Sequence, residues 1–134
     1  MKIFNIIFGV LFIVFAGLQY NDPDPYLWVP IYLYAAGLCI LAVKNKFYPV
    51  SYHIGLLFYV CYAAYKIFDT NGLLDWITIH HEESLVQTMK AQKPWIEEAR
   101  EFFGLLICTG VLLINRVYYR SKRKYKLPRN RFAK

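Results

Sequence analysis

Residues 3–20 read IFNIIFGVLFIVFAGLQY and carry no charged side chain over eighteen positions. At a rise of about 1.5 Å per residue, a helix of this length covers about 27 Å, close to the hydrocarbon thickness of a bilayer. The run is longer than the apolar region of a typical signal peptide, and no A-x-A cleavage motif follows it. The stretch therefore predicts a membrane-spanning helix that is retained in the protein.

Three more apolar blocks follow, and the breaks between them are polar and contain proline. Hydrophobic residues make up 57% of the 134 residues, more than a soluble domain usually has. We predict an all-α integral membrane bundle of four transmembrane helices, at about residues 3–20, 25–43, 50–68 and 94–119. Residues 1–120 would form this domain, and residues 121–134 a basic cytoplasmic tail that is poorly ordered.

The ends of the second and third helices carry charged residues with expected roles. Asp24 precedes Pro25, so its carboxylate is expected to cap the second helix by accepting free backbone N–H groups. Lys66 lies near the end of the third helix and is expected to snorkel to the interface. Residues 69–93 mix apolar and polar side chains, which indicates a short amphipathic segment on the membrane surface, with a mobile loop as the alternative.

The distribution of Lys and Arg predicts the orientation. With a cytoplasmic N-terminus, the cytoplasmic segments hold twelve basic residues and no acidic ones, while the other side holds four basic and all nine acidic residues. Such an asymmetry orients helices, so both termini are expected in the cytoplasm. In a bacterium this would place the protein in the inner (plasma) membrane.

Two acidic motifs are then predicted on the extracytoplasmic side, and we take them as one candidate polar site. Its candidate residues are Asn21, Asp22, Asp24, Glu97, Glu98, Arg100 and Glu101. Ionisable groups near the hydrocarbon are costly and usually pair inside the bundle. Arg100 would bridge a glutamate of its own helix and an aspartate of the loop. The remaining carboxylates would hold a cation, a proton or a polar ligand, unless the motifs are only a turn and a structural clamp.

A second cluster, His80, His81, Glu82 and Glu83, has metal-capable side chains without the H-E-x-x-H spacing. A solvated polar face is the simpler interpretation of it. Cys39, Cys61 and Cys108 each lie in an apolar block and form no recognisable thiol motif, so we expect no disulfide. No sequence motif of a known catalytic site is present, and we predict no cofactor.

The last nineteen positions hold nine of the sixteen basic residues. A basic cluster directly after a membrane helix is a topology anchor and a site for anionic lipid headgroups, which favours lipid over nucleic acid as its partner. The candidate headgroup contacts are Arg116, Arg120, Lys122, Arg123, Lys124 and Lys126.

The two acidic motifs also carry a resemblance. Gln19-Tyr20-Asn21-Asp22-Pro23-Asp24, followed by Trp28 and Tyr32, is one stretch. Glu97-Glu98-Ala99-Arg100-Glu101, followed by Gly104-Leu105-Leu106-Ile107, is the other. In these stretches the sequence resembles the transmembrane protein 220 family of small multi-pass membrane proteins. The resemblance implies a helical membrane protein and no particular activity, and it favours more than a local role for the acidic residues.

Three functions are compatible with this sequence. We favour a non-enzymatic accessory or binding subunit whose acidic site meets a membrane-protein partner, a second copy of the chain, a lipid headgroup or an ion. The alternative is an interfacial enzyme that uses Asp22, Asp24, Glu98 and Glu101 on a lipid-linked substrate. A cation or proton carrier is the weakest, because few polar side chains lie deeper in the helices.

Overall fold

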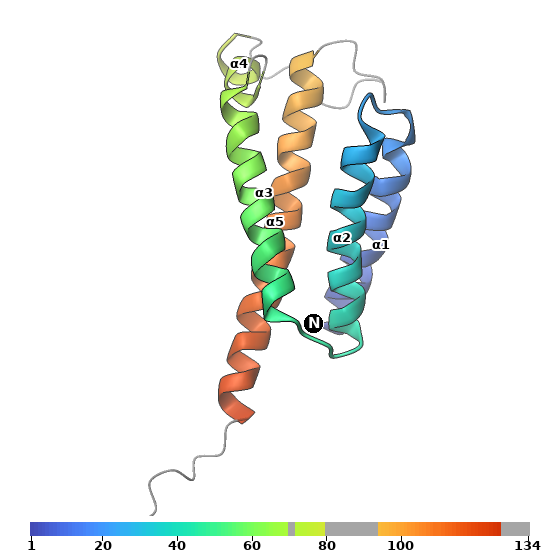
Figure 1. The fold of residues 1–134 in the computed structure, drawn as a ribbon, viewed down its shortest axis with the longest axis vertical. Coiled ribbons are helices and arrows are strands. Elements are labelled where there is room, and N and C mark those ends of the chain that lie inside the picture. The colour runs from blue at the N-terminus through green and yellow to red at the C-terminus, as the bar shows by residue number, and fades with distance from the viewer. Residues whose placement is uncertain (70–71, 80–93, 127–134) are drawn as a thin grey trace, which may run out of the picture.

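The computed structural model describes residues 1–69, 72–79 and 94–126, and in these residues it is all-helical. The helices are α1 (Lys2–Leu18), a 3-10 turn η1 (Gln19–Asn21), α2 (Pro25–Val43), α3 (Pro49–Phe68), α4 (Leu73–Thr78) and α5 (Pro94–Lys126). They form an elongated bundle in which the long helices run up and down (Figure 1). The predicted all-α class is confirmed.

Among the described residues, three helical segments are long and apolar enough to cross a membrane. They are Lys2–Asn21, Pro25–Val43 and Trp95–Tyr125. The helix α3 is similar in length, with 20 residues, but its tyrosines, His53 and Lys66 lower its mean hydropathy. The chain therefore has three candidate spans by composition and a fourth long helix that packs with them.

Proline begins three of the long helices. Pro25, Pro49 and Pro94 each occupy the first helical position, where a missing N–H costs no hydrogen bond. The expected side-chain cap at Asp24 is wrong. The Asp24 carboxylate makes no cap hydrogen bond and instead accepts the hydroxyl of Tyr26 at 3.0 Å, while the Asp24 carbonyl accepts the first backbone N–H groups of α2.

The helix α5 does not end near Tyr119 but continues to Lys126, so part of the predicted tail is helical. The sequence explains this extension, because residues 120–126 contain no helix breaker and Pro128 follows closely. Within the predicted amphipathic segment, the short helix α4 begins directly after Gly72. The remainder of that segment, residues 80–93, lies outside the described residues.

The long helices pack as two pairs, with α1 against α2 and α3 against α5 (Figure 1). Tyrosine hydroxyls tie α3 and α5 to backbone carbonyls of α2. Tyr59 donates to Ile31 at 2.7 Å and Tyr52 to Leu38 at 3.1 Å. A hydroxyl that reaches a neighbouring helix satisfies a polar group that lipid cannot satisfy.

The outer faces of the helices are apolar and the inner contacts include the polar groups. Ile3, Leu57 and Val117 are 73%, 69% and 64% exposed, whereas Asn5 and Asn115 are at most 1% exposed. This distribution is the reverse of a water-soluble bundle and suits a surface covered by lipid.

Asn5 of α1 and Asn115 of α5 form a reciprocal amide pair near the end of the bundle that holds the N-terminus. Each side-chain amide nitrogen donates to the other side-chain oxygen, at 2.9 and 2.6 Å. The pair joins the two helix pairs at this end, where Tyr119 also donates to the carbonyl of Ala42 at 2.7 Å.

We expect Asn115→Leu to destabilise the bundle by about 1–3 kcal/mol, because the buried Asn5 amide loses both hydrogen bonds to Asn115 and keeps only the one that its nitrogen donates to the Met1 carbonyl. Asn5→Leu/Asn115→Leu should recover part of this loss, since two apolar side chains leave no buried polar group. Thermal unfolding in detergent measures Asn115→Leu, Asn5→Leu and the double variant. If the stability lost in the double variant equals the sum of the losses in the two single variants, the amide pair does not contribute as described.

Candidate functional site

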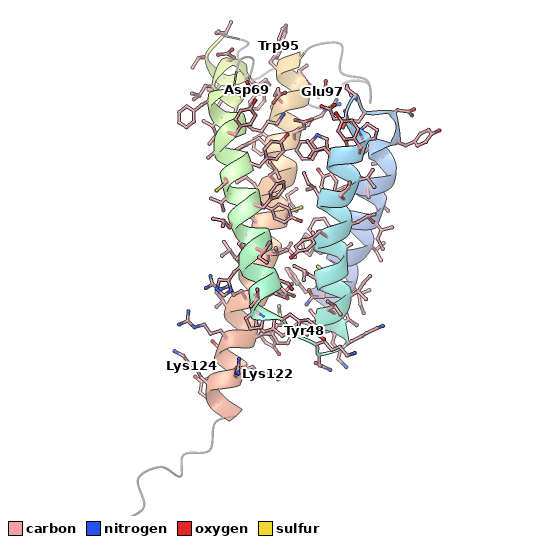
Figure 2. All side chains as sticks on the ribbon, viewed as in Figure 1. Tyr48, Asp69, Trp95, Glu97, Lys122 and Lys124 are labelled. Atoms are coloured by element: carbon pink, nitrogen blue, oxygen red, sulfur yellow. The ribbon has the colours of Figure 1, made fainter. Side chains whose placement is uncertain are left out.

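The candidate site lies at the end of the bundle opposite the N-terminus, where Glu97 is labelled in Figure 2. Three parts of the chain supply it. Asp22 follows the η1 turn, Lys66 lies in the last turn of α3, and Glu97, Glu98 and Glu101 lie in the first turns of α5. Residues far apart in the sequence are therefore brought to one place.

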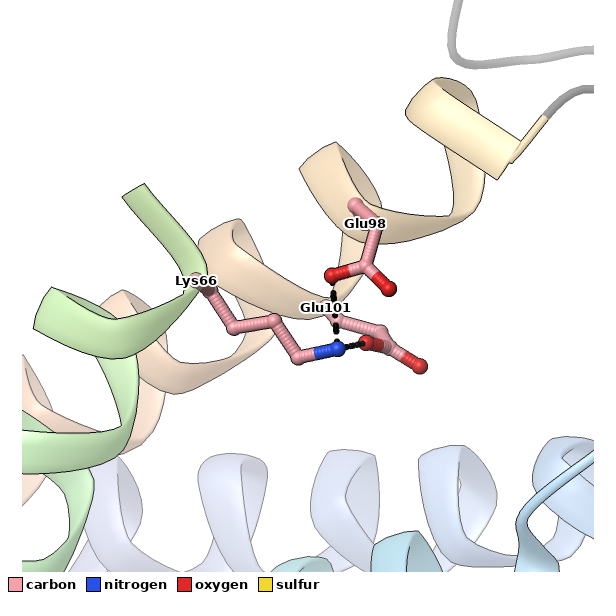
Figure 3. A network of polar contacts seen from close by, with 3 residues as sticks. All are labelled: Lys66, Glu98 and Glu101. Carbon is pink, nitrogen blue, oxygen red and sulfur yellow. Dashed lines mark hydrogen bonds and ion pairs between the residues drawn. The ribbon is translucent and has the colours of Figure 1, made fainter. Parts of the chain in front are cut away.

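Lys66 is the central cation of this site. Its ammonium lies 2.6 Å from Glu98 Oε2 and also pairs with Glu101 Oε2 (Figure 3). Glu98 and Glu101 are three residues apart on α5, which places both carboxylates on the face turned towards α3. The ion pairs therefore tie α3 to α5 at this end of the bundle.

The expectation that Lys66 snorkels to the interface is wrong, because the residue is only 6% exposed. Its ammonium is also 5.5 Å from the ring centroid of Tyr62 and 5.9 Å from that of Trp28. Two carboxylates and two aromatic faces thus replace the water that a snorkelling lysine would reach. These partners explain why the side chain turns inward.

The carboxylates of Asp22, Glu97 and Glu101 converge beside this ion pair. One oxygen from each lies within 4.8 Å of the others. Glu101 is buried, while Asp22 and Glu97 are half-buried. The structure therefore brings the two predicted acidic motifs together at these three residues.

The other predicted residues of the site lie around this centre. Asn21 and Asp24 are exposed, and Arg100 is half-buried on α5. In the described part of the chain, Lys66 is the cation that pairs with both Glu98 and Glu101. The proposed bridging role of Arg100 stays a prediction.

Gly104 permits a close helix contact directly below the acidic residues. It lies one turn from Glu101 on α5, and a Cβ added there would overlap the hydroxyl oxygen of Tyr32. Tyr32 is buried and packs against the rings of Trp28 and Phe12. Glycine therefore lets the Tyr32 hydroxyl approach the α5 backbone just beneath the site.

The convergent carboxylates can hold a cation or share a proton. Like charges so close together disfavour the fully ionised state, which a bound proton or cation relieves. Oxygen-only ligands suit hard cations such as Ca²⁺, Mg²⁺ or Mn²⁺. Of the other candidate ligands, His80, His81, Glu82 and Glu83 lie outside the described residues, and the three cysteines are free thiols.

At the opposite end, the candidate lipid contacts follow the exposed surface of α5. Arg120, Lys122, Arg123 and Lys124 are exposed, and Arg116 is half-buried. Arg116 Nη2 lies 2.7 Å from His53 Nε2, and His53 Nδ1 lies 2.6 Å from the carbonyl oxygen of Pro49. With Nδ1 donating to that carbonyl, Nε2 accepts from the guanidinium, so this arrangement corresponds to a neutral imidazole.

The sequence reasoning missed the role of Lys66. A signal for it was present, because Lys66 is a cation at the apolar-to-polar boundary on the side that carries all nine acidic residues. Such a cation within a membrane helix usually pairs with another group of the bundle. Trp28 and Tyr62 were not predicted as part of the site. Apart from their aromatic side chains, nothing in the sequence indicates that they contact Lys66.

Long apolar helices with lipid-suited outer faces and an internal polar cluster define an integral membrane protein. The family described as "Transmembrane family 220, helix" matches residues 11–117, so the chain belongs to that family. The match confirms the predicted resemblance and covers the helices that carry the site. No curated protein and no solved structure matches the chain.

We expect Lys66→Met to destabilise the protein by about 3 kcal/mol, because it leaves the buried Glu101 and the partly buried Glu98 without their cation. Lys66→Met/Glu101→Gln should be less destabilised, since one buried charge is removed with the lysine. The measurement is thermal unfolding in detergent, with the exposed Lys46→Met as the matched control. Equal stability of Lys66→Met and Lys46→Met would contradict a structural ion pair.

Gly104→Ala should destabilise the bundle by about 1–3 kcal/mol, because the added methyl group overlaps the Tyr32 hydroxyl. Tyr32→Phe removes that oxygen and should restore much of the loss when combined with Gly104→Ala. Gly110→Ala, where an added Cβ meets nothing within 4 Å, is the control. An identical cost of Gly104→Ala with Tyr and Phe at position 32 would exclude this contact as the cause.

Proposed function

We propose that the chain crosses the membrane four times, with α3 as the fourth span. The outer face of α3 is apolar, with Val50, Leu57 and Val60 all more than half exposed. The polar groups that lower its hydropathy turn inward, since Tyr52 and Tyr59 donate to α2 and Lys66 pairs with α5. A helix that satisfies its polar groups within the bundle can lie in hydrocarbon.

The Lys/Arg asymmetry supports cytoplasmic termini in this topology. Lys2 begins α1, Lys44 and Lys46 follow α2, and the basic part of α5 extends from the same end of the bundle, where Lys122 and Lys124 lie, whereas the described acidic residues such as Asp69 and Glu97 lie at the other end (Figure 2). Positively charged segments are retained in the cytoplasm. The acidic site is then at the extracytoplasmic mouth, and in a bacterium the membrane is the inner one.

The topology is testable with single cysteines in a chain whose three native cysteines are replaced by alanine. Lys46→Cys and Thr78→Cys flank α3 and are both exposed. In intact cells, a membrane-impermeant maleimide should label Cys at position 78 and should label position 46 only after permeabilisation. Labelling of both positions from the same side would show that α3 does not cross.

The function we propose is that of a non-enzymatic accessory subunit which binds a cation, or a cationic group of a partner, at the acidic site. The observation that carries it is the convergence of Asp22, Glu97 and Glu101 within 4.8 Å. Lys66 pairs with Glu98 and Glu101, but one ammonium does not balance the four carboxylates of the site. The remaining negative charge favours the binding of a cation. A half-buried position at the membrane boundary strengthens such an interaction relative to bulk water.

We expect CaCl₂ or MnCl₂ to raise the unfolding temperature of the detergent-solubilised protein relative to choline chloride at equal ionic strength. At tenfold the dissociation constant, the stabilisation is about 1.4 kcal/mol, or roughly 5 °C for a domain of this size. Asp22→Asn/Glu97→Gln should abolish the shift. Asp24→Asn, which changes an exposed carboxylate outside the convergent trio, should keep it.

Native mass spectrometry of the same samples gives the stoichiometry. A metal adduct that is lost in the double variant would support cation binding. It would also favour the alternative function of an interfacial enzyme, which can then be assayed with lipid-linked substrates. The absence of any cation response in the natural protein would sink the ion-binding proposal and leave the cluster as a contact for a partner.

A further inference from the structure

An apolar groove with a volume of about 290 Å³ follows the seam between α2 and α3. Ile31, Gly55 and Tyr59 line it and are buried, so they form its floor. Ile54 and Phe58 also line it and are 59% and 45% exposed, so the groove opens on the lipid-suited surface of the bundle.

The walls of the groove offer rings and aliphatic groups rather than free hydroxyls. The hydroxyl of Tyr59 on the floor is bound to the carbonyl of Ile31 at 2.7 Å, and the hydroxyl of Tyr34 on the rim to the carbonyl of Ser51 at 2.8 Å. A ligand within the groove therefore meets an apolar surface, which suits a hydrocarbon chain.

The groove is long enough to hold part of one acyl chain. The groove extends along α2 from Tyr26 to Tyr34, which is about 12 Å at the helical rise. Its volume is about 290 Å³, and it is open along the lipid-suited surface.

A single carboxylate, that of Asp24, lies next to a residue at the outer end of the groove. Tyr26 lines this end, and its hydroxyl donates to Asp24 Oδ1 at 3.0 Å, so the carboxylate lies beside the Tyr26 side chain. Pro30 has no N–H, so the carbonyl of Tyr26 lacks the donor that the fourth following residue of a helix normally supplies. A carboxylate and a freed carbonyl together favour a positively charged donor.

We propose that the groove holds one acyl chain of a phospholipid with a primary ammonium headgroup, of the phosphatidylethanolamine class. The chain lies against Tyr59 and Phe58, and the ammonium donates to the Asp24 carboxylate and the Tyr26 carbonyl. An anionic phospholipid meets the Asp24 charge without compensation and binds more weakly. The inference rests on the proposed crossing of α3, but it does not depend on cation binding by the convergent carboxylates.

The test is a lipid titration followed by native mass spectrometry of the whole chain in detergent. The probes are dioleoyl phosphatidylethanolamine, phosphatidylcholine and phosphatidylglycerol, which share their acyl chains. We expect the ethanolamine lipid to bind about fivefold more tightly than the glycerol lipid, the effect of about 1 kcal/mol from an exposed ionic contact. Phosphatidylcholine, which has the charge but no N–H, should fall between them.

Two variants separate the chain from the headgroup. Ile54→Trp/Phe58→Trp fills the groove and should weaken all three lipids, while Leu57→Trp, on an exposed residue of α3 outside the groove, should not. Asp24→Asn should remove the preference among headgroups and retain binding of the chain. Circular dichroism and thermal unfolding confirm that each variant is folded.

Lipid binding that is unchanged in Ile54→Trp/Phe58→Trp would overturn the groove assignment, and a preference for the glycerol lipid would overturn the headgroup assignment. Cysteine labelling on both sides of α3 shows separately whether α3 crosses the membrane, so a wrong lipid assignment can be told from a wrong topology. If positions 46 and 78 label from opposite sides and the lipid preference is absent, only this inference falls.

Discussion

A polar group inside a bilayer must find its partner within the protein, because hydrocarbon supplies neither donors nor acceptors. In this chain the partners are on neighbouring helices. Tyr52 and Tyr59 of α3 donate to carbonyls of α2, and Asn5 of α1 pairs with Asn115 of α5. The same residues that make the helices less hydrophobic therefore hold them together, and the arrangement of the bundle follows from where these partners lie.

The buried ion pair of Lys66 is the strongest case of this constraint. Moving a lysine and two glutamates away from water has a large desolvation cost, which the mutual attraction offsets only when all three remain in contact. Trp28 and Tyr62 complete the surroundings of the ammonium with their ring faces. The ion pairs therefore join α3 and α5 at the site, and Asp22 approaches it from the connection between α1 and α2.

The sequence predicts the helices well and their contacts poorly. Uncharged runs such as residues 3–20 predict membrane helices directly, because apolar length is a local property. The N-D-P-D and E-E-x-R-E motifs carry the resemblance to the family that matches residues 11–117. Which cation meets Glu98 and Glu101 is not local. Arg100 is near them in sequence, whereas Lys66 reaches them only because α3 packs against α5. The end of α5 was also misjudged, since basic residues form a helix as readily as apolar ones.

The two ends of the bundle differ in how they join the helix pairs. At the end with the N-terminus, the amide pair of Asn5 and Asn115 is attractive in every charge state of the protein. At the other end, Asp22 belongs to the first pair and Glu97 and Glu101 to the second, and their contact is between like charges. That contact becomes favourable only when a proton or a cation lies between them. Occupancy of the proposed site would thus set how firmly the two helix pairs are held together at this end of the bundle.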